Sequence, residues 1–346
     1  MSGNSMARAP VFREKLPERV AVLRAVGGLG DFLCVVPALR SLRAALPQAT
    51  LTLIGLPAVK PLVQRFSHYI DELVEFPGFP GLPEQSSQLE EFPAFLEAMH
   101  QRQFDLAIQM HGSGIITNPL TMLLNASVTA GFYLPNQYCP DRQTFLPYQP
   151  EESEVRRYLR LLEFLGFPTR GEALEFTVQA EDWQALRQIP GVQSLFQRDF
   201  VCLHPGASLA TKRWSVQQFA QVGDSLAGWG LPVVLTGNAA ERELTQAVAI
   251  AMQAPSYNLA GCTSLPTLAA LLLRSRLLVC NDTGVSHLAA ALQVPSVVLF
   301  SNSDPQRWAP LDRQRHRVVE TANSTLVTVL TQASELLQRG GVYAAS

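Results

Sequence analysis

Short apolar segments of the strand type alternate with amphipathic segments of the helix type along this chain, and this alternation restricts the fold more than any other feature. In the second half it predicts helices between strands at 200–203, 232–235, 257–259, 277–280 and 296–300. A strand, a helix and a second strand at this spacing form a parallel unit, because the helix returns the chain to the starting edge of the sheet. The second half is therefore predicted to be a doubly wound parallel α/β sheet.

The first half repeats the pattern and predicts a second sheet of the same kind. Strands are expected at 20–26, 51–55 and 106–108. A helix from about 32 to 46 carries apolar residues along one side. A chain of 346 residues is long enough for two domains of ordinary size. We place the boundary near residue 175, which gives domains 1–175 and 176–346.

Composition excludes several classes of protein. Lysine and arginine total 27 and aspartate and glutamate total 29, so a formal net charge of −2 disfavours nucleic acid as a partner. Five cysteines without a C-x-x-C pair indicate buried thiols in a reducing compartment. The first nineteen residues contain no apolar run, so we expect no secretory signal and a cytoplasmic location. Arg274 and Arg276 interrupt the longest apolar stretch, so we expect no helix of the ~20 apolar residues that a membrane span requires. Peripheral contact with a membrane stays open.

The segment 279–292 predicts a strand, a turn and a helix that together can hold an anion. A helix start presents unpaired N–H groups and the positive end of the helix dipole, so phosphate binds there readily. Asp282 or Thr283 can cap the helix, Gly284 lets a ligand approach the backbone, and His287 lies one turn further on the same face. The alternative is a capped core helix with a satisfied histidine.

A second loop of this kind follows the strand at 200–203. It offers backbone contacts at Gly206, the hydroxyl of Ser208 and two adjacent cations, Lys212 and Arg213. Because ligands of open parallel sheets bind beyond the carboxyl ends of the strands, both loops are expected at the same edge. The alternative is a cation pair on a solvated loop.

The glycine-rich turn at 27–31 offers a different chemistry. A dinucleotide-binding fingerprint fails here, because its third glycine would fall at Leu33. The Asp31 carboxylate would repel a pyrophosphate, but near a helix N-terminus it suits a general base. The alternative is that Asp31 only caps its helix. Gly30, Arg24 and His111 are weaker candidates for contact with an acceptor, and a plain turn is the alternative at His111.

Taken together, these segments resemble glycosyltransferase family 9, the ADP-heptose:lipopolysaccharide heptosyltransferases, over nearly the whole chain. The segments that carry the resemblance are Arg24 to Pro37, Phe104 to Ile108, His204 to Trp214, Thr236 to Glu241 and Asn281 to His287. The resemblance implies a GT-B fold, with two Rossmann-like domains facing a central cleft. The second domain would bind the nucleotide-sugar donor and the first the acceptor, with the helix near 324–338 packing back across the first domain.

The resemblance also implies roles for single residues. Asp31 would be the catalytic base, and Lys212 would contact the donor diphosphate together with the turn Asp282-Thr283-Gly284 and His287. Glu241 would bind the ribose, and the segment of Thr263, Ser264 and Leu265 would bind the adenine. Asn238 departs from the family pattern, where a second glycine is frequent, and residues 76–100 and 132–150 match no pattern.

The implied function is an inverting transfer of a heptose or related sugar from an ADP-sugar to a lipopolysaccharide core or similar surface glycan, as glycolipid or oligosaccharide. The chain contains no Asp-x-Asp motif and no His/Cys cluster of ligand spacing, so we expect neither metal nor cofactor. Two alternatives remain open: a sugar-nucleotide 2-epimerase of similar fold, and a nucleotide-sugar binding module without catalysis.

Overall fold

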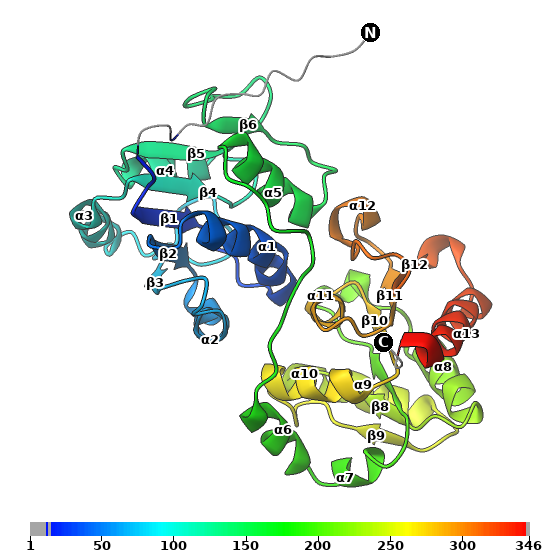
Figure 1. Ribbon diagram of the computed structural model, residues 1–346. Helices are drawn as coiled ribbons and strands as arrows, with labels where there is room; N and C mark the ends of the chain where they lie inside the picture. Colours follow the sequence, from blue (N-terminus) through cyan, green and yellow to red (C-terminus); the bar gives the residue numbers. More distant parts are fainter. Residues whose placement is uncertain (1–11, 13–14, 344–346) are drawn as a thin grey trace. The chain divides into compact units, whose positions relative to one another are not determined.

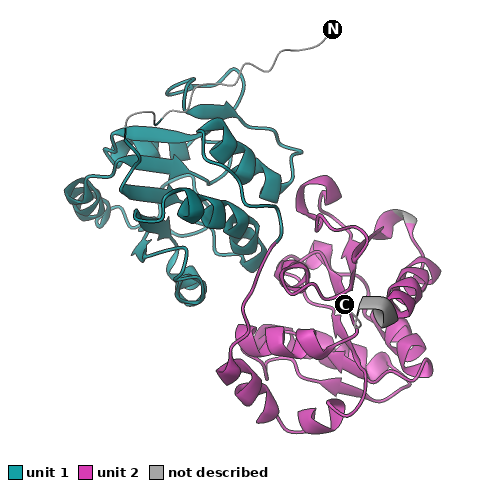
Figure 2. Cartoon of the chain, in the orientation of Figure 1, with its two compact units in different colours: residues 1–173 teal, residues 174–346 magenta. Residues whose placement is uncertain are grey.

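The chain forms two six-stranded sheets, and the strands within each sheet are parallel (Figure 1). The computed structural model describes Phe12 and residues 15–343. One sheet belongs to a compact unit of residues 1–173 and the other to a unit of residues 174–346, here called unit 1 and unit 2 (Figure 2). The α/β class with two doubly wound parallel sheets is thereby confirmed.

In unit 1 the sheet has the order β3-β2-β1-β4-β5-β6, so β1 and β4 are its central strands. Its strands are β1 Arg19–Leu23, β2 Thr50–Gly55, β3 Glu72–Glu75, β4 Leu106–Gln109, β5 Val128–Tyr133 and β6 Phe145–Pro147. Its helices are α1 Leu29–Ala45, α2 Lys60–Arg65, α3 Phe92–Arg102, α4 Thr117–Leu123 and α5 Glu154–Phe164, with a 3-10 turn η1 at Pro57–Val59. Both β2 and β4 pair in parallel with β1, so the loops after β1 and β4 emerge side by side.

Helix α1 starts at Leu29, three residues before the predicted start at 32. Gly28 is its N-cap residue in an extended conformation and makes no side-chain cap. A sequence pattern that looks for a capping side chain misses such a start. Gly30 and Asp31 are therefore residues of the first helical turn and do not belong to a loop before the helix.

The Pro/Gly-rich segment at 76–83 is part of the crossover between β3 and α3. Phe76 is buried in a core cluster of unit 1, and Phe79 and Leu82 pack against that cluster. The Phe79 ring lies 5.2 Å from the ring of Phe92, and Phe76 meets Phe95 edge-on at 5.8 Å. The aromatic residues of this segment thus anchor the crossover to the sheet, which their irregular spacing did not predict.

Unit 2 has the sheet order β12-β11-β10-β7-β8-β9. Its strands are β7 Val201–His204, β8 Val233–Leu235, β9 Ser256–Asn258, β10 Leu277–Asn281, β11 Ser296–Phe300 and β12 His316–Glu320. Its helices are α6 Ala180–Arg187, α7 Val192–Leu195, α8 Val216–Gly228, α9 Arg242–Ala251, α10 Leu265–Arg274, α11 Gly284–Ala291, α12 Pro305–Trp308 and α13 Leu326–Tyr343. Short 3-10 turns are η2 Ala210–Lys212, η3 Ala239–Glu241 and η4 Thr321–Asn323.

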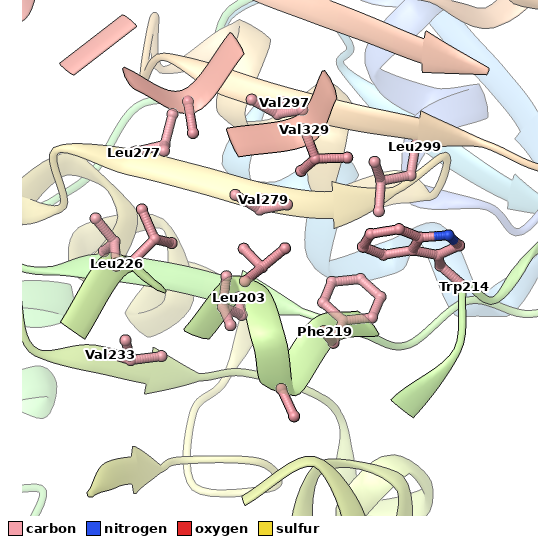
Figure 3. Close-up of a cluster of buried hydrophobic side chains, with 14 of the residues drawn as sticks. Leu203, Trp214, Phe219, Leu226, Val233, Leu277, Val279, Val297, Leu299 and Val329 are labelled. Carbon is pink, nitrogen blue, oxygen red and sulfur yellow. The ribbon is translucent and has the colours of Figure 1, made fainter. Parts of the chain in front are cut away.

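A continuous apolar core lies between the unit 2 sheet and the helices that cover one of its faces (Figure 3). Leu203 and Val279 come from the central strands β7 and β10, and Phe219 and Leu226 from α8. The long last helix α13 contributes three buried residues to this same core, Val329, Ala333 and Leu336. It contacts α8, β10, β11 and β12.

Three of the five cysteines, Cys34, Cys202 and Cys280, are buried, as the sequence predicts, whereas Cys262 is exposed. Burial raises the pKa of Cys202 to about 12, so this thiol remains protonated and unreactive. Throughout the described part of the chain, every helix is too short or too polar to cross a membrane.

Candidate active site

Most of the candidate residues of unit 2 follow four strands that are neighbours in the sheet, in the order β10, β7, β8 and β9. The strands are parallel, so the loops that follow them emerge at one edge. Asp282, Thr283, Gly284 and His287 follow β10, Ser208 and Lys212 follow β7, Glu241 follows β8, and Thr263, Ser264 and Leu265 follow β9. The sequence separates these residues by up to 79 positions, and the sheet brings them to a common edge.

The turn between β10 and α11 leaves the start of the helix without a side-chain cap. Thr283 is the N-cap residue, but its side chain makes no capping hydrogen bond. The Asp282 side chain, which the sequence also offered as a cap, bonds elsewhere. The first N–H groups of a helix have no partner within the helix, so this start remains able to bind an anion. His287, in the same turn of α11, is buried and meets the Trp308 ring edge-on at 6.2 Å.

Lys212 and Asp282 form an ion pair across two loops. The Lys212 Nζ atom lies 2.9 Å from Asp282 Oδ2, with exposed side-chain fractions of 22% and 4%. The Asp282 carboxylate therefore holds the lysine and is not itself available to an anionic ligand. Arg213 has a supporting function, because its guanidinium donates twice to the Ala207 carbonyl within the same loop. Ser208 in this loop is exposed.

Asn281 joins these two loops, a role that sequence reasoning missed. Its amide oxygen accepts from the Trp214 N–H at 3.0 Å, and its Nδ2 donates to the Pro205 carbonyl at 2.8 Å. The side chain is fully buried. The sequence signal was an asparagine at the end of a buried strand, but its partners lie 67 and 76 residues away.

Glu241 sits over the backbone of the β7 loop. Its Oε2 accepts from the Asn238 N–H at 2.8 Å, and the Asn238 side chain accepts from the Glu241 N–H, which together form a capping box. The departure from the family pattern at Asn238 therefore has a structural role. A Cβ atom at Gly206 would lie 2.0 Å from Glu241 Oε1, so only glycine leaves room for this carboxylate.

His204 lies next to the Glu241 carboxylate. Its Nδ1 lies 3.0 Å from the Thr236 hydroxyl, and its Nε2 lies 3.9 Å from Glu241 Oε2. Burial lowers the pKa of His204, so the ring is neutral near pH 7. His204 and Thr236 begin two of the segments that carry the family resemblance, but the sequence assigned neither of them a role at the site.

The segment of Thr263, Ser264 and Leu265 leads into α10. Ser264 is the N-cap residue, and its hydroxyl accepts from the Thr267 N–H at 3.3 Å. The preceding turn is attached to α9, because the Arg242 side chain donates to the carbonyls of Ala260 and Gly261.

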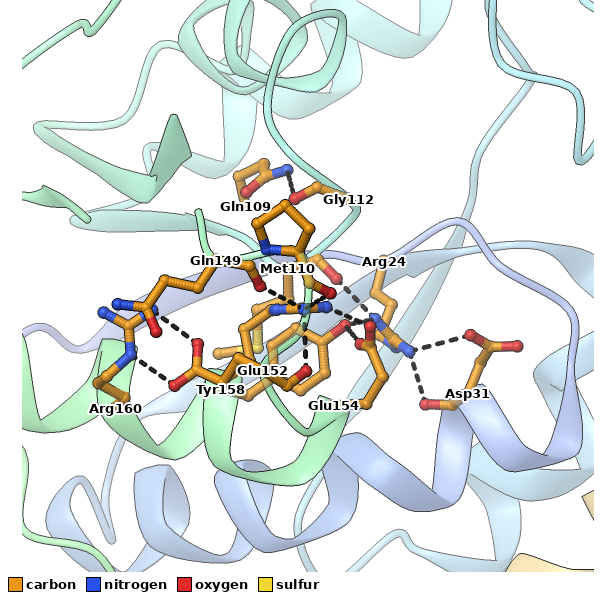
Figure 4. Close-up of polar contacts among 12 residues, drawn as sticks. Arg24, Asp31, Gln109, Met110, Gly112, Gln149, Glu152, Glu154, Tyr158 and Arg160 are labelled. Atoms are coloured by element: carbon orange, nitrogen blue, oxygen red, sulfur yellow. Dashed lines mark hydrogen bonds and ion pairs between the residues drawn. The ribbon is translucent and has the colours of Figure 1, made fainter. Parts of the chain in front are cut away.

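In unit 1, Asp31 is paired with Arg24 (Figure 4). Arg24 Nη2 lies 3.5 Å from Asp31 Oδ1 and donates to the Asp31 backbone carbonyl at 2.7 Å. The Asp31 side chain is 34% exposed and Arg24 only 4%. Asp31 can thus reach a ligand, whereas Arg24, expected on the acceptor side, is a buried support for Asp31.

His111 follows β4, next to β1 in the sheet. It is buried, and its Nε2 lies 3.1 Å from Glu84 Oε1. Burial lowers the pKa of His111, so the ring is neutral near pH 7. Glu84 belongs to the 76–100 segment, for which the sequence gave no role. Among the described residues no group of three His, Cys, Asp or Glu side chains is placed to hold a metal ion.

Comparison with solved structures defines the class of this fold. A glycosyl transferase family 9 protein of Veillonella parvula matches with a TM-score of 0.77 at 22% identity, over 93% of this chain and 97% of that one. The Escherichia coli ADP-heptose lps heptosyltransferase II matches with a TM-score of 0.73 at 23% identity, over 93% and 99%. The fold is that of the GT-B glycosyltransferases.

Sequence comparison identifies the family. The model of glycosyltransferase family 9 (heptosyltransferase) matches residues 93–335. The lipopolysaccharide heptosyltransferase 2 of Salmonella typhimurium is 26% identical over 300 residues, which cover 83% of this chain and 84% of that protein. The chain belongs to glycosyltransferase family 9, and the resemblance noted in its sequence is confirmed.

Proposed function

We propose that this glycosyltransferase transfers a heptose, or a closely related sugar, from an ADP-sugar to a lipopolysaccharide core or similar surface glycan, with inversion at the anomeric carbon. The solved relative named above is described as an ADP-heptose enzyme, and the Salmonella relative as a lipopolysaccharide heptosyltransferase. The observation that carries the proposal is the order of residues along the unit 2 sheet edge.

That order matches the parts of a nucleoside diphosphate. The uncapped start of α11 and the nearby Lys212 suit the diphosphate, and they follow β10 and β7. Glu241 follows β8 and is proposed to bind the ribose hydroxyls, and Thr263 follows β9 and is proposed to contact the base. Neighbouring strands lie about 4.8 Å apart, so the four loops provide an extended row of contacts for an extended ligand.

Asp31 is proposed as the general base. Its carboxylate takes the proton of an acceptor hydroxyl while that oxygen bonds to the anomeric carbon. The bond from this carbon to the diphosphate oxygen breaks, and the electron pair leaves with ADP. Attack opposite the leaving group inverts the configuration.

The departing diphosphate gains negative charge, which the helix N-terminus and the Lys212 ammonium stabilise electrostatically. We therefore propose that transfer needs no divalent metal ion. Transfer that is undiminished in excess chelator agrees with this, and strict dependence on magnesium or manganese contradicts it.

Binding and turnover test the proposal separately. Calorimetry with ADP, GDP and UDP should give heat for ADP at the lowest concentration, and a preference for UDP or GDP would refute the donor class. Asp31→Asn should retain ADP binding and lose transfer by about 100-fold or more. Incubation of the ADP-sugar without acceptor should give no isomer, whereas an isomer would identify an epimerase. ADP binding with no transfer to any acceptor glycan would indicate a binding module.

A further inference from the structure

A buried chain of polar groups in unit 1 runs from helix α5 to Asp31 (Figure 4). Arg24 is its central member. Its Nη1 donates to the Met110 carbonyl at 2.7 Å and to the Tyr158 hydroxyl at 2.5 Å. Its Nη2 donates to the Asp31 carbonyl at 2.7 Å. These acceptors come from the end of β4, from α5 and from the first turn of α1, so they fix both the position and the plane of the guanidinium.

The hydroxyl of Tyr158 has a defined direction of hydrogen bonding. Burial raises the pKa of Tyr158, so its hydroxyl keeps its proton. That proton is donated to Glu154 Oε2 at 2.6 Å. The same oxygen therefore presents a lone pair to Arg24, whose guanidinium can only donate. The Tyr158 ring also lies under Arg24, at 4.7 Å from the guanidinium carbon.

Glu154 is held in turn by Arg157. The two side chains form an ion pair, with exposed fractions of only 2% and 1%. Arg157 Nη2 also donates to the backbone carbonyls of Gln149, Pro150 and Glu152. The chain of contacts is thus anchored in backbone at one end and reaches a partly exposed carboxylate, Asp31, at the other.

A set of buried charges needs an explanation other than stability. Desolvation offsets most of the attraction between buried ions, and apolar residues of similar size often give equal stability. The feature that an apolar replacement could not reproduce is the oriented donor that Arg24 presents to Asp31. A general base must be held in a productive geometry, and small displacements reduce turnover strongly.

We propose that Tyr158 and Glu154 are positioning residues for sugar transfer, acting through Arg24 to fix the carboxylate of Asp31. The inference rests on the proposed role of Asp31 as the base. Helix α5 carries neither the base nor a proposed donor-binding residue. If Tyr158 and Glu154 position the base, this helix nevertheless determines the turnover rate.

Tyr158→Phe tests the inference, with Tyr148→Phe as its matched control. Both rings meet Phe132 edge-on, at 6.3 Å and 6.1 Å, and both lie beside a buried arginine. Tyr148 faces Arg157 through its ring, whereas Tyr158 reaches Arg24 through its hydroxyl. Tyr158→Phe should lower kcat by about 10- to 100-fold with an unchanged KM for the donor, because the proposed donor residues lie in unit 2. Tyr148→Phe should keep the parent kcat.

The Asp31→Asn protein serves as a second background, which separates an effect on the position of the base from a general disturbance of the structure. In an Asp31→Asn protein, adding Tyr158→Phe should reduce single-turnover transfer no further, because the group that it positions is already lost. An equal fall in both backgrounds would overturn the inference. Arg24→Lys keeps the charge but loses the planar fork, so it should reproduce the kcat effect if Tyr158→Phe fails to fold.

The outcomes distinguish this inference from the proposed function. If Asp31→Asn loses transfer but Tyr158→Phe and Arg24→Lys keep the parent kcat, positioning through α5 is refuted and the base stands. If Asp31→Asn itself keeps the parent kcat, both are refuted.

Discussion

The ammonium of Lys212 lies 2.9 Å from the carboxylate of Asp282, which follows directly on the buried strand β10. The pair places one positive and one negative charge beside the uncapped start of α11. An anionic ligand there meets a lysine already held in position and a carboxylate already neutralised. Removing the lysine alone should therefore weaken the binding of an anionic ligand more than removing both charges.

We expect Lys212→Ala to weaken ADP binding by about 10- to 100-fold, because the Asp282 carboxylate then faces the diphosphate without a partner. The double variant Lys212→Ala with Asp282→Asn should recover part of that loss. Lys60→Ala removes an equal charge from α2 in unit 1 and should leave ADP affinity unchanged. Calorimetric titration with ADP measures all three, and equal affinities for the single and double variants would contradict the explanation.

Gly206→Ala should displace the Glu241 carboxylate, since the new methyl group would lie 2.0 Å from its Oε1. We expect a loss of ADP affinity of at least about tenfold. At Gly228, in the last turn of α8, a methyl group meets no atom within 4 Å. Gly228→Ala should therefore keep ADP affinity and raise stability by about 0.5–1 kcal/mol. A Gly206→Ala protein that binds ADP normally would show that this carboxylate has room to move.

Asn281→Ala should loosen the loop between β7 and α8. The change leaves the Trp214 N–H and the Pro205 carbonyl without their buried partner, at a cost of about 1–3 kcal/mol for each group. Hydrogen–deuterium exchange at residues 205–214 should then be faster than in the parent protein, with a lower midpoint of unit 2 unfolding. Unchanged exchange over this segment would show that water or backbone replaces the amide.

His316 should make unit 2 sensitive to acid. Burial lowers the pKa of this histidine to about 4 in the folded protein, where its Nδ1 lies 2.9 Å from the Ser296 hydroxyl. The pKa of this histidine is about 6.5 in the unfolded chain and about 4 in the folded protein, so above pH ~6.5 the histidine costs no stability. As the pH falls from the higher to the lower value, the free energy of unfolding should decrease by about 3 kcal/mol, and below it the decrease should level off.

His316→Gln keeps a group able to bond Ser296 and removes this titration. Its urea midpoint should change less between pH 7 and pH 4 than that of the parent protein. The same pH dependence in both proteins would assign the acid sensitivity to other groups.

The strands and helices of unit 2 were largely predictable, because each follows from a local apolar period. The predicted strand at 296–300 agrees with β11 to the residue, and the predicted strands at 277–280 and 200–203 agree with β10 and β7 to within one residue at each end. Helix α1 was predicted to start too late, because its cap is the backbone of Gly28 and not a side chain. The strand order then explains why motifs distant in the sequence meet at one edge.

The partners of individual side chains were not predictable from local patterns. Arg24 meets Tyr158 134 residues away, and Asn281 meets Pro205 76 residues away. His111 meets Glu84 in a segment without a recognisable motif. Such pairs depend on how elements pack, and neither periodicity nor capping rules carry that information.

The near-total burial of Arg24, Glu154 and Arg157 has a consequence for how this family diverges. Losing Glu154 or Arg157 would leave its partner's charge alone in the protein interior, and losing Arg24 would leave the Tyr158 hydroxyl and the Met110 carbonyl without their buried donor, each at a cost that few intermediates survive. We expect descendants to inherit the three together or to replace them together. An alignment of related sequences should show these three residues replaced together, even where the other residues of α5 vary independently.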